Sequence, residues 1–198
     1  MAGKQARPGL VQDSLGPDLK PVYNPNPPPP PKGYKGTDPQ ITSAASFNEW
    51  YHSADGVNME VMGELALTEI MPGLWSFASG AFYPLTDKGL GNNVTPNWDG
   101  KTYPKLNGAF TTEIHTMFVY EQGQVFSFSG DDDVWIFVDG VLALDLGGLH
   151  PNQKGTIELD SLGLVPGDVY TLDAFHAERC DSGSNFRIDT SIACFIPQ

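Results

Sequence analysis

The chain has 198 residues, of which 40% are hydrophobic and 11% aromatic, and this length and composition suit one packed domain. Eleven Lys and Arg against 24 Asp and Glu give a formal net charge of −13, which argues against non-specific binding to nucleic acid or to an anionic membrane. No apolar run approaches the roughly 18 residues of a membrane span, so membrane insertion is not expected. The N-terminus lacks an apolar signal, which fits either a cytoplasmic protein or a piece of a longer exported protein.

Residues 1–40 are rich in Pro, Gly, Lys and Asp. The run from Pro27 to Pro31 favours an extended polyproline II conformation without backbone donors, so this stretch cannot be a central strand. We predict an extended N-terminal arm over residues 1–40 that packs on, or leads into, a single domain over residues 41–198. The prolines act either as a stiff spacer or as a PxxP-type ligand for a partner domain.

A short helix and then strands are expected after the arm. Ser46 followed three positions later by Glu49 has the pattern of a helix cap and predicts a helix near residues 46–51, the only one of note. From residue 60 the apolar period shortens to two, which predicts strands over residues 60–67 and 74–77.

Residues 85–109 form a long segment rich in Gly, Asn, Asp and Pro. A loop of this length exceeds what packing needs, and long loops are often functional. Within it, Trp98 either stacks on the face of a sugar or plugs the loop onto the domain.

The second half of the chain has the clearest strand pattern. Asp139-Gly140 is the strongest signal for a two-residue β-hairpin turn, because a type I′ turn needs positive φ at both central residues. Strands separated by turns at short spacing predict an all-β fold, an antiparallel β-sandwich with long loops and one short helix. We expect strands over residues 116–120, 124–129, 134–138, 141–146, 155–159, 169–175 and 186–195.

Three consecutive carboxylates, Asp131, Asp132 and Asp133, follow Gly130 between two predicted strands. Their mutual repulsion makes it costly to keep all three ionised, and a bound cation removes that cost. Ca²⁺ suits an oxygen-only ligand set, and the nearby sequence offers no Cys-His cluster for zinc. The alternative is a solvated acidic turn capped by backbone amides.

A second loop must complete a calcium shell, and residues 178–185 offer oxygen donors. Arg179 or Arg187 suits an ion pair with a carboxylate better than a ligand contact. No nucleophile elbow, phosphate-binding Gly loop or HExxH pair is present, so no catalytic residue is proposed and the chain does not have the pattern of an enzyme. The candidate metal ligands in the second loop are Glu178, Asp181 and Asn185, and the candidate ligand contacts are Ser184 and, outside this loop, His150, whose alternative is a structural role.

The stretch from Phe126 to Gly140, together with Leu144 to His150, resembles the fibro-slime domain. That domain belongs with the β-sandwich lectins of the anthrax protective-antigen type, which include yeast flocculins and bacterial adhesin modules. Residues 15–23, 47–58 and 175–191 agree with it, so the resemblance covers nearly the whole chain.

The resemblance implies a mechanism. In the calcium-dependent lectins of this superfamily, two adjacent Asp residues joined by a cis peptide bind Ca²⁺, which then takes vicinal sugar hydroxyls. Asp131 and Asp132 match that pair, and Asp133 stands where Gly is common. The function expected is a calcium-dependent carbohydrate-binding or adhesion module of a secreted or cell-surface protein, whose partners are glycans and neighbouring modules of a larger adhesin or fibre. The alternatives are a structural module of an extracellular matrix and, less suited to adjacent aspartates, a glycosidase.

Overall fold

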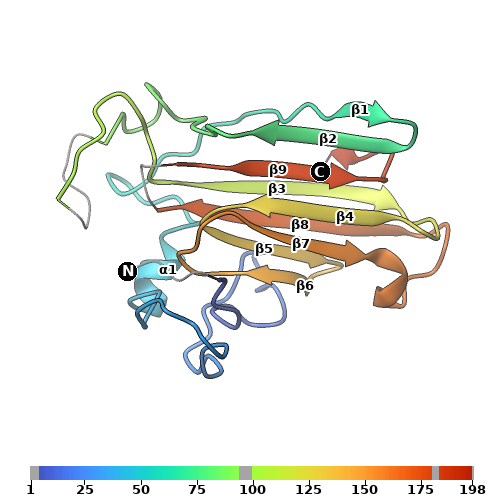
Figure 1. Ribbon diagram of the computed structural model, residues 1–198, viewed down its shortest axis with the longest axis horizontal. Coiled ribbons are helices and arrows are strands. Elements are labelled where there is room, and N and C mark those ends of the chain that lie inside the picture. Colours follow the sequence, from blue (N-terminus) through green and yellow to red (C-terminus); the bar gives the residue numbers. More distant parts are fainter. Residues whose placement is uncertain (1–4, 94–99, 180–182, 198) are drawn as a thin grey trace.

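Two antiparallel sheets of five strands each form the domain in the computed structural model, which describes residues 5–93, 100–179 and 183–197 (Figure 1). The strands of both sheets run along the long axis of the molecule. The first sheet has the order β1 (Thr68–Met71), β2 (Leu74–Ser79), β9 (Phe186–Thr190), β4 (Val125–Gly130) and β7 (Gln153–Glu158). The second has the order β10 (Ile196–Pro197), β3 (Phe110–Val119), β8 (Val169–Glu178), β5 (Asp133–Val138) and β6 (Val141–Leu146).

The space between the sheets is filled mainly by aromatic and branched side chains. Successive residues of a strand point to opposite faces, so Phe126 and Phe128 of β4 both enter this core. Phe128 packs edge-on against Phe186 of β9, with ring centroids 4.9 Å apart. The all-β sandwich predicted from the period-two pattern is therefore confirmed.

Strand β5 is buried on both faces, which explains its unbroken apolar sequence from Val134 to Val138. Val134 and Ile136 face the core between the sheets. Trp135 and Phe137 face the opposite way and join a second apolar cluster with residues of the N-terminal arm and of helix α1 (Ala44–Asn48).

The N-terminal arm packs against this outer face of the second sheet (Figure 1). Leu10 and Val11 are buried there. The arm also extends the sheet, because Ser14 forms a β-bridge with Val141 of β6 and the amide of Leu142 donates to the Asp13 carbonyl at 2.9 Å. The arm thus covers apolar surface that the second sheet would otherwise expose to water.

Helix α1 starts earlier than the sequence pattern indicated. Ser43, not Ser46, caps it, and the Ser43 hydroxyl accepts a hydrogen bond from the Ser46 amide at 3.1 Å. The predicted cap at Ser46 is therefore wrong. A second helical segment, a 3₁₀ turn at Leu159–Leu162, was not expected.

The predicted strand over residues 60–67 is also wrong. Leu65 and Leu67 pack against the core, but the residues before Thr68 form no ladder. The period-two pattern arises here because alternate residues pack against the core on one side, without pairing to a neighbouring strand. The predicted strand over residues 186–195 ends at Thr190, whose hydroxyl accepts from the Ile192 amide at 3.1 Å where the chain turns.

The other predicted strands are present with shifted ends. Strand β3 begins at Phe110, β7 begins at Gln153 and β8 continues to Glu178. The hairpin turn at Asp139-Gly140 is confirmed, with φ of 51° and 72°. Among the described residues, no helix is long and apolar enough to cross a membrane.

Candidate functional site

The candidate site lies where the turn from β4 to β5 meets the segment that enters β9. Gly130 ends β4 and pairs with Phe186, so the next residue, Asp131, lies beside Asn185. A Cβ on Gly130 would stand 2.5 Å from the Asn185 carbonyl oxygen. Only glycine therefore permits this close approach of the two segments.

Asp131 is held by Asn185 through both carboxylate oxygens. The Asn185 backbone amide donates to Oδ1 at 2.7 Å, and the Asn185 side-chain amide donates to Oδ2 at 2.7 Å. The peptide bond between Asp131 and Asp132 is cis, as the family resemblance implies. Each carboxylate oxygen has a second lone pair, so both can still donate a lone pair to a cation.

Asp132 is buried, with 6% of its surface exposed, and has few partners. Its Oδ2 accepts one hydrogen bond, from the Arg179 backbone amide at 3.2 Å, and no described residue donates to Oδ1. Burial, together with the neighbouring charge of Asp133, raises the pKa of Asp132 to about 7, and the nearby Arg179 only partly opposes this. An ionised Asp132 therefore lacks compensating positive charge.

Asp133 is fully buried and already paired. Its Oδ2 lies 2.7 Å from Nε of Arg179, and its Oδ1 accepts from the Gly148 amide at 2.5 Å. With both oxygens engaged by the protein, this carboxylate is structural, and the geometry does not support Asp133 as a metal ligand. The three aspartates therefore have separate roles.

The arginines behave as predicted. Arg179 pairs with Asp133, and Arg187 forms a bidentate pair with Asp189 at 2.8 Å. Arg179 also donates through Nη1 to the Gln40 carbonyl at 2.7 Å. Its guanidinium lies over the ring of Trp50, 5.1 Å from the ring centroid.

Two predicted ligand contacts face the protein interior. Ser184 is fully buried, and its carbonyl accepts from the Phe82 amide at 3.0 Å. His150 is 2% exposed, and its ring nitrogens lie 2.8 Å and 3.0 Å from the carbonyls of Leu146 and Pro151. The geometry gives His150 the structural role and does not support either side chain as a sugar contact.

The remaining candidates have mixed outcomes. Glu178 is buried at the end of β8, and its position as a calcium ligand stays a prediction. Trp98 and Asp181 lie outside the described residues. Within the described ranges no group of three or more His, Cys, Asp or Glu side chains is arranged to hold a metal ion, in line with the structural role of Asp133.

Sequence reasoning missed His176, which supports the aspartate turn from the core. Its Nε2 donates to the Asp131 carbonyl at 2.8 Å, and it packs edge-on against Phe186 with ring centroids 5.3 Å apart. Complete burial lowers the pKa of His176 to about 4, so the ring is neutral. The sequence signal that could have located His176 was its position in β8, where alternate residues point into the core between the sheets.

The donors near Asp131 suit a hard cation. The Asp131 and Asp132 carboxylates supply oxygen, and Asn185 retains its side-chain oxygen after its nitrogen binds Asp131. All of these atoms are oxygens, which fits Ca²⁺ and not a soft metal.

A shallow groove of about 230 Å³ begins at this site. Asn185 lies in its wall, so the groove and the aspartate turn share one residue. Its lining offers hydroxyl, amide and guanidinium groups, which are the partners that sugar hydroxyls need. The polar residues that line the groove are Ser79, Ser129, Asn152, Asn185 and Arg187.

The chain is similar to the PA14 domain and to several proteins of Dictyostelium discoideum. The sequence model of the PA14 domain matches residues 72–194. Protein psiQ of Dictyostelium discoideum is 34% identical over 96% of the chain, psiD is 37% identical over 93%, and psiC is 40% identical over 77%. The chain spans only 19%, 36% and 30% of these three proteins. No solved structure gives a significant match.

PA14 domains are β-sandwich, lectin-like modules of the anthrax protective-antigen type. They are carbohydrate-binding or adhesion-type modules of extracellular or surface proteins. The matched residues include β2 to β9, the cis Asp131-Asp132 pair and Asn185. The chain therefore belongs to the PA14 domain family.

Proposed function

We propose that this chain is a calcium-dependent carbohydrate-binding or adhesion module, of the fibro-slime type, in a secreted or cell-surface protein. Asp131, Asp132 and Asn185 hold Ca²⁺ through oxygen atoms. The observation that carries the proposal is the buried Asp132 carboxylate, which lies beside Asp131 and accepts a single hydrogen bond from the described residues. Such a group is expensive to keep ionised without a cation.

Hydrogen bonds within the chain orient the carboxylates of the site without a bound ligand. Asn185 fixes the orientation of the Asp131 carboxylate with two donors, and the Arg179 amide fixes that of Asp132. Bound Ca²⁺ supplies coordination positions that accept vicinal hydroxyls of a sugar. The groove beside Asn185 then offers polar groups to the rest of the glycan.

We do not propose an enzyme. Two carboxylates that hold one metal ion leave neither free as the acid or base of a glycosidase. Turnover of an oligosaccharide that is lost in Asp132→Ala would contradict this part of the proposal.

Calcium titration tests the metal site. Ca²⁺ titrated calorimetrically into metal-free protein is expected to bind with a Kd on the order of 10⁻⁴ to 10⁻³ M, the range of extracellular calcium modules. The double variant Asp131→Asn/Asp132→Asn should lose this binding, whereas Asp160→Asn, which removes a carboxylate from the 3₁₀ turn, should keep it. Equal heats of Ca²⁺ binding in the wild type and the double variant would contradict the assignment of the metal site.

A glycan array tests the partner. Multivalent display of the protein on the array compensates for a weak single site. Binding that disappears with EDTA and returns with added Ca²⁺ supports the lectin function. Binding that is indifferent to EDTA rejects the role of calcium.

A second function, a structural module of an extracellular fibre or matrix, is favoured by one observation. Edge strand β1 is exposed along its whole length, and its apolar residues include Ile70 and Met71. Such an edge can pair with a neighbouring module. Chelator-dependent loss of thermal stability without binding to any glycan would favour this function over the first.

A further inference from the structure

We propose that the N-terminal arm and the segment just after helix α1 form part of the calcium site, because Gln40 and Trp50 in these segments hold Arg179, the positioning residue that fixes Asp132 and Asp133. This inference rests on the proposed function. It assigns a role to a part of the chain that lies before residues 72–194, the segment that matches the PA14 domain.

Arg179 is the link between the arm and the aspartates. On one side its Nε lies 2.7 Å from Asp133, and its backbone amide donates to Asp132 at 3.2 Å. On the other side its Nη1 donates to the carbonyl of Gln40 at 2.7 Å, and its guanidinium lies 5.1 Å from the ring centroid of Trp50. Neither of these two partners lies in the segment that matches the family.

A second set of contacts links the arm to Asp133 through the chain after β6. The Gly148 amide donates to Asp133, and the next amide, of Leu149, donates to the side-chain oxygen of Gln40 at 2.9 Å. Gly148 has φ of +96°, and a Cβ on it would stand 2.7 Å from Cβ of Arg7. Gly148 and Leu149, which follow β6, therefore lie between the arm and the aspartate turn and contact both.

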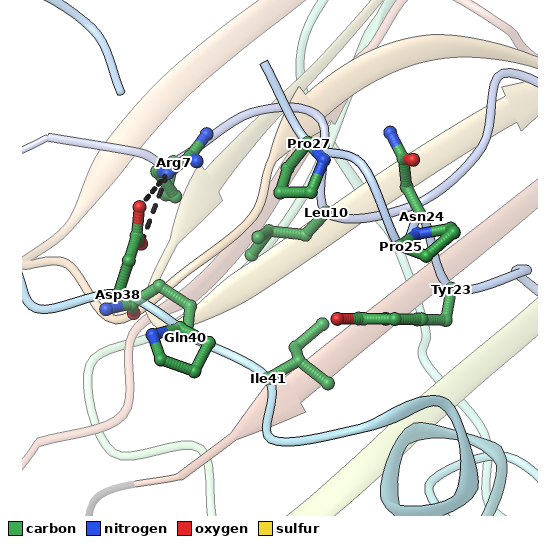
Figure 2. A pocket seen from close by; sticks show the side chains of 10 residues that line it. Arg7, Leu10, Tyr23, Asn24, Pro25, Pro27, Asp38, Gln40 and Ile41 are labelled. Atoms are coloured by element: carbon green, nitrogen blue, oxygen red, sulfur yellow. Dashed lines mark hydrogen bonds and ion pairs between the residues drawn. The ribbon is translucent and has the colours of Figure 1, made fainter. Parts of the chain in front are cut away.

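The segment that leads to Gln40 is joined to the start of the arm by an ion pair. Figure 2 shows Nε of Arg7 bound to the Asp38 carboxylate, at 3.0 Å from Oδ2, beside a cavity of about 340 Å³ that Gln40 also lines. Asp38 lies two residues before Gln40, so the Arg7–Asp38 pair anchors the chain next to Gln40 at the edge of this cavity.

As a physical consequence, the neighbouring carboxylates Asp132 and Asp133 have different roles. Arg179 neutralises Asp133, which leaves the adjacent Asp132 as the carboxylate available to a cation. If the arm contacts were lost, the guanidinium would no longer be directed between Asp133 and Gln40. The amide that orients Asp132 belongs to the same residue, so it would move as well.

The relatives support the arm as part of the same unit. The similarity to psiQ extends over 96% of the chain and so includes most of the arm and α1, well beyond the match to the PA14 domain. An arm that only connected two modules would have no reason to contact Arg179 and Leu149, whose neighbours along the chain reach the aspartate turn.

The test is a calorimetric titration of Ca²⁺ into the full chain at a temperature where each variant is folded. Trp50→Leu removes the aromatic face under Arg179, and Arg179→Lys keeps the charge but cannot bind Asp133, Gln40 and the Trp50 ring together. Both should weaken Ca²⁺ binding by about 10-fold, the usual effect of losing a group that orients a metal ligand. Lys20→Gln is the matched control, because it removes an arm ion pair with Glu113 that does not involve Arg179.

The thermal unfolding midpoint without Ca²⁺ is measured for each variant to separate stability from positioning. A 10-fold loss of affinity in Trp50→Leu, with affinity within twofold of wild type in Lys20→Gln, supports the inference even if both midpoints fall equally. Unchanged affinity in folded Trp50→Leu and Arg179→Lys, while Asp131→Asn/Asp132→Asn abolishes binding, would overturn the inference and leave the proposed function standing. A wild-type protein that binds no Ca²⁺ would instead overturn the proposed function, and the inference with it.

Discussion

Three adjacent aspartates of identical chemistry have different environments in this molecule. Asp131 is bound by Asn185, Asp133 is bound by Arg179, and Asp132 has one hydrogen bond, from a backbone amide, among the described residues. Removing the charge of each should therefore have a different effect.

Asp133→Ala should destabilise the protein strongly, because it leaves the Arg179 guanidinium without its buried partner. Breaking a buried ion pair in this way costs roughly 3–5 kcal/mol. Urea unfolding of the metal-free protein measures the change. In contrast, Asp132→Asn removes a charge that lacks compensation, so it should leave the metal-free protein at least as stable as the wild type. A larger loss in Asp132→Asn than in Asp133→Ala would contradict this assignment.

His115 gives a pH-dependent contribution to stability. Its imidazole lies 2.8 Å from Asp173 and 3.1 Å from Glu113, which is also paired with Lys20, and these hydrogen bonds raise the pKa of His115 from 6.5 to about 9. A pKa that is higher in the folded state stabilises the protein fully below about pH 6.5, and this stabilisation is lost as the pH rises through about 9.

His115→Gln should therefore lower the thermal midpoint at pH 6 by about 2–6 °C and have a smaller effect at pH 10. Differential scanning calorimetry of both proteins at the two pH values measures this. The partly exposed position of the ring keeps the effect modest, since solvent screens the pair. A difference between the two proteins that is the same at pH 6 and pH 10 would refute the role of the imidazolium.

At the scale of elements, the site depends on how closely the turn after β4 approaches the start of β9. Gly130→Ala places a methyl group 2.5 Å from the Asn185 carbonyl, so the two segments must separate. We expect loss of both Asn185 hydrogen bonds to Asp131 and at least a 10-fold loss of Ca²⁺ affinity. Gly63→Ala is the control for the loss of a glycine alone, because Gly63, like Gly130, does not have positive φ but has open space where the new methyl group would stand. Affinity that falls equally in both variants would mean that the close approach is unimportant.

Much of the element order could be predicted from the sequence. Period-two alternation located most strands of the second half, and the Asp139-Gly140 turn was identified from its need for positive φ. The errors have physical causes. Residues 60–67 alternate because Leu65 and Leu67 contact the core without strand pairing, and α1 is capped one turn early because Ser43 offers its hydroxyl before Ser46.

The site was predictable only in part. The local signal of adjacent carboxylates pointed to Asp131 and Asp132, but local sequence carries no sign that Gln40 and Trp50 lie near them. Their contacts with Arg179 depend on the arm folding back across the second sheet. The structural role of Asp133 depends on the same arrangement, which is why three equivalent carboxylates in the sequence become unequal in the fold.

For the whole molecule, bound calcium should raise stability by mass action. A ligand that binds only the folded state at 100 times its Kd adds about 2.7 kcal/mol. We expect the thermal midpoint to rise by about 5–11 °C for a chain of this size under that condition. The same titration with Mg²⁺ should give a smaller rise, because Mg²⁺ demands a tighter octahedral shell. No rise in the midpoint with Ca²⁺ at any concentration would contradict binding to the folded state.

The contact between Arg179 and Gln40 has a consequence for the order in which the protein folds. These residues are 139 positions apart in the chain. Closing such a loop costs chain entropy before its contacts reward it, and non-local contacts of this kind slow folding. During synthesis the arm leaves the ribosome before β8, so its partner Arg179 does not yet exist when the arm emerges. The ligand site is therefore expected to be among the last parts to form, so the ability to bind a ligand reports that the whole domain is complete.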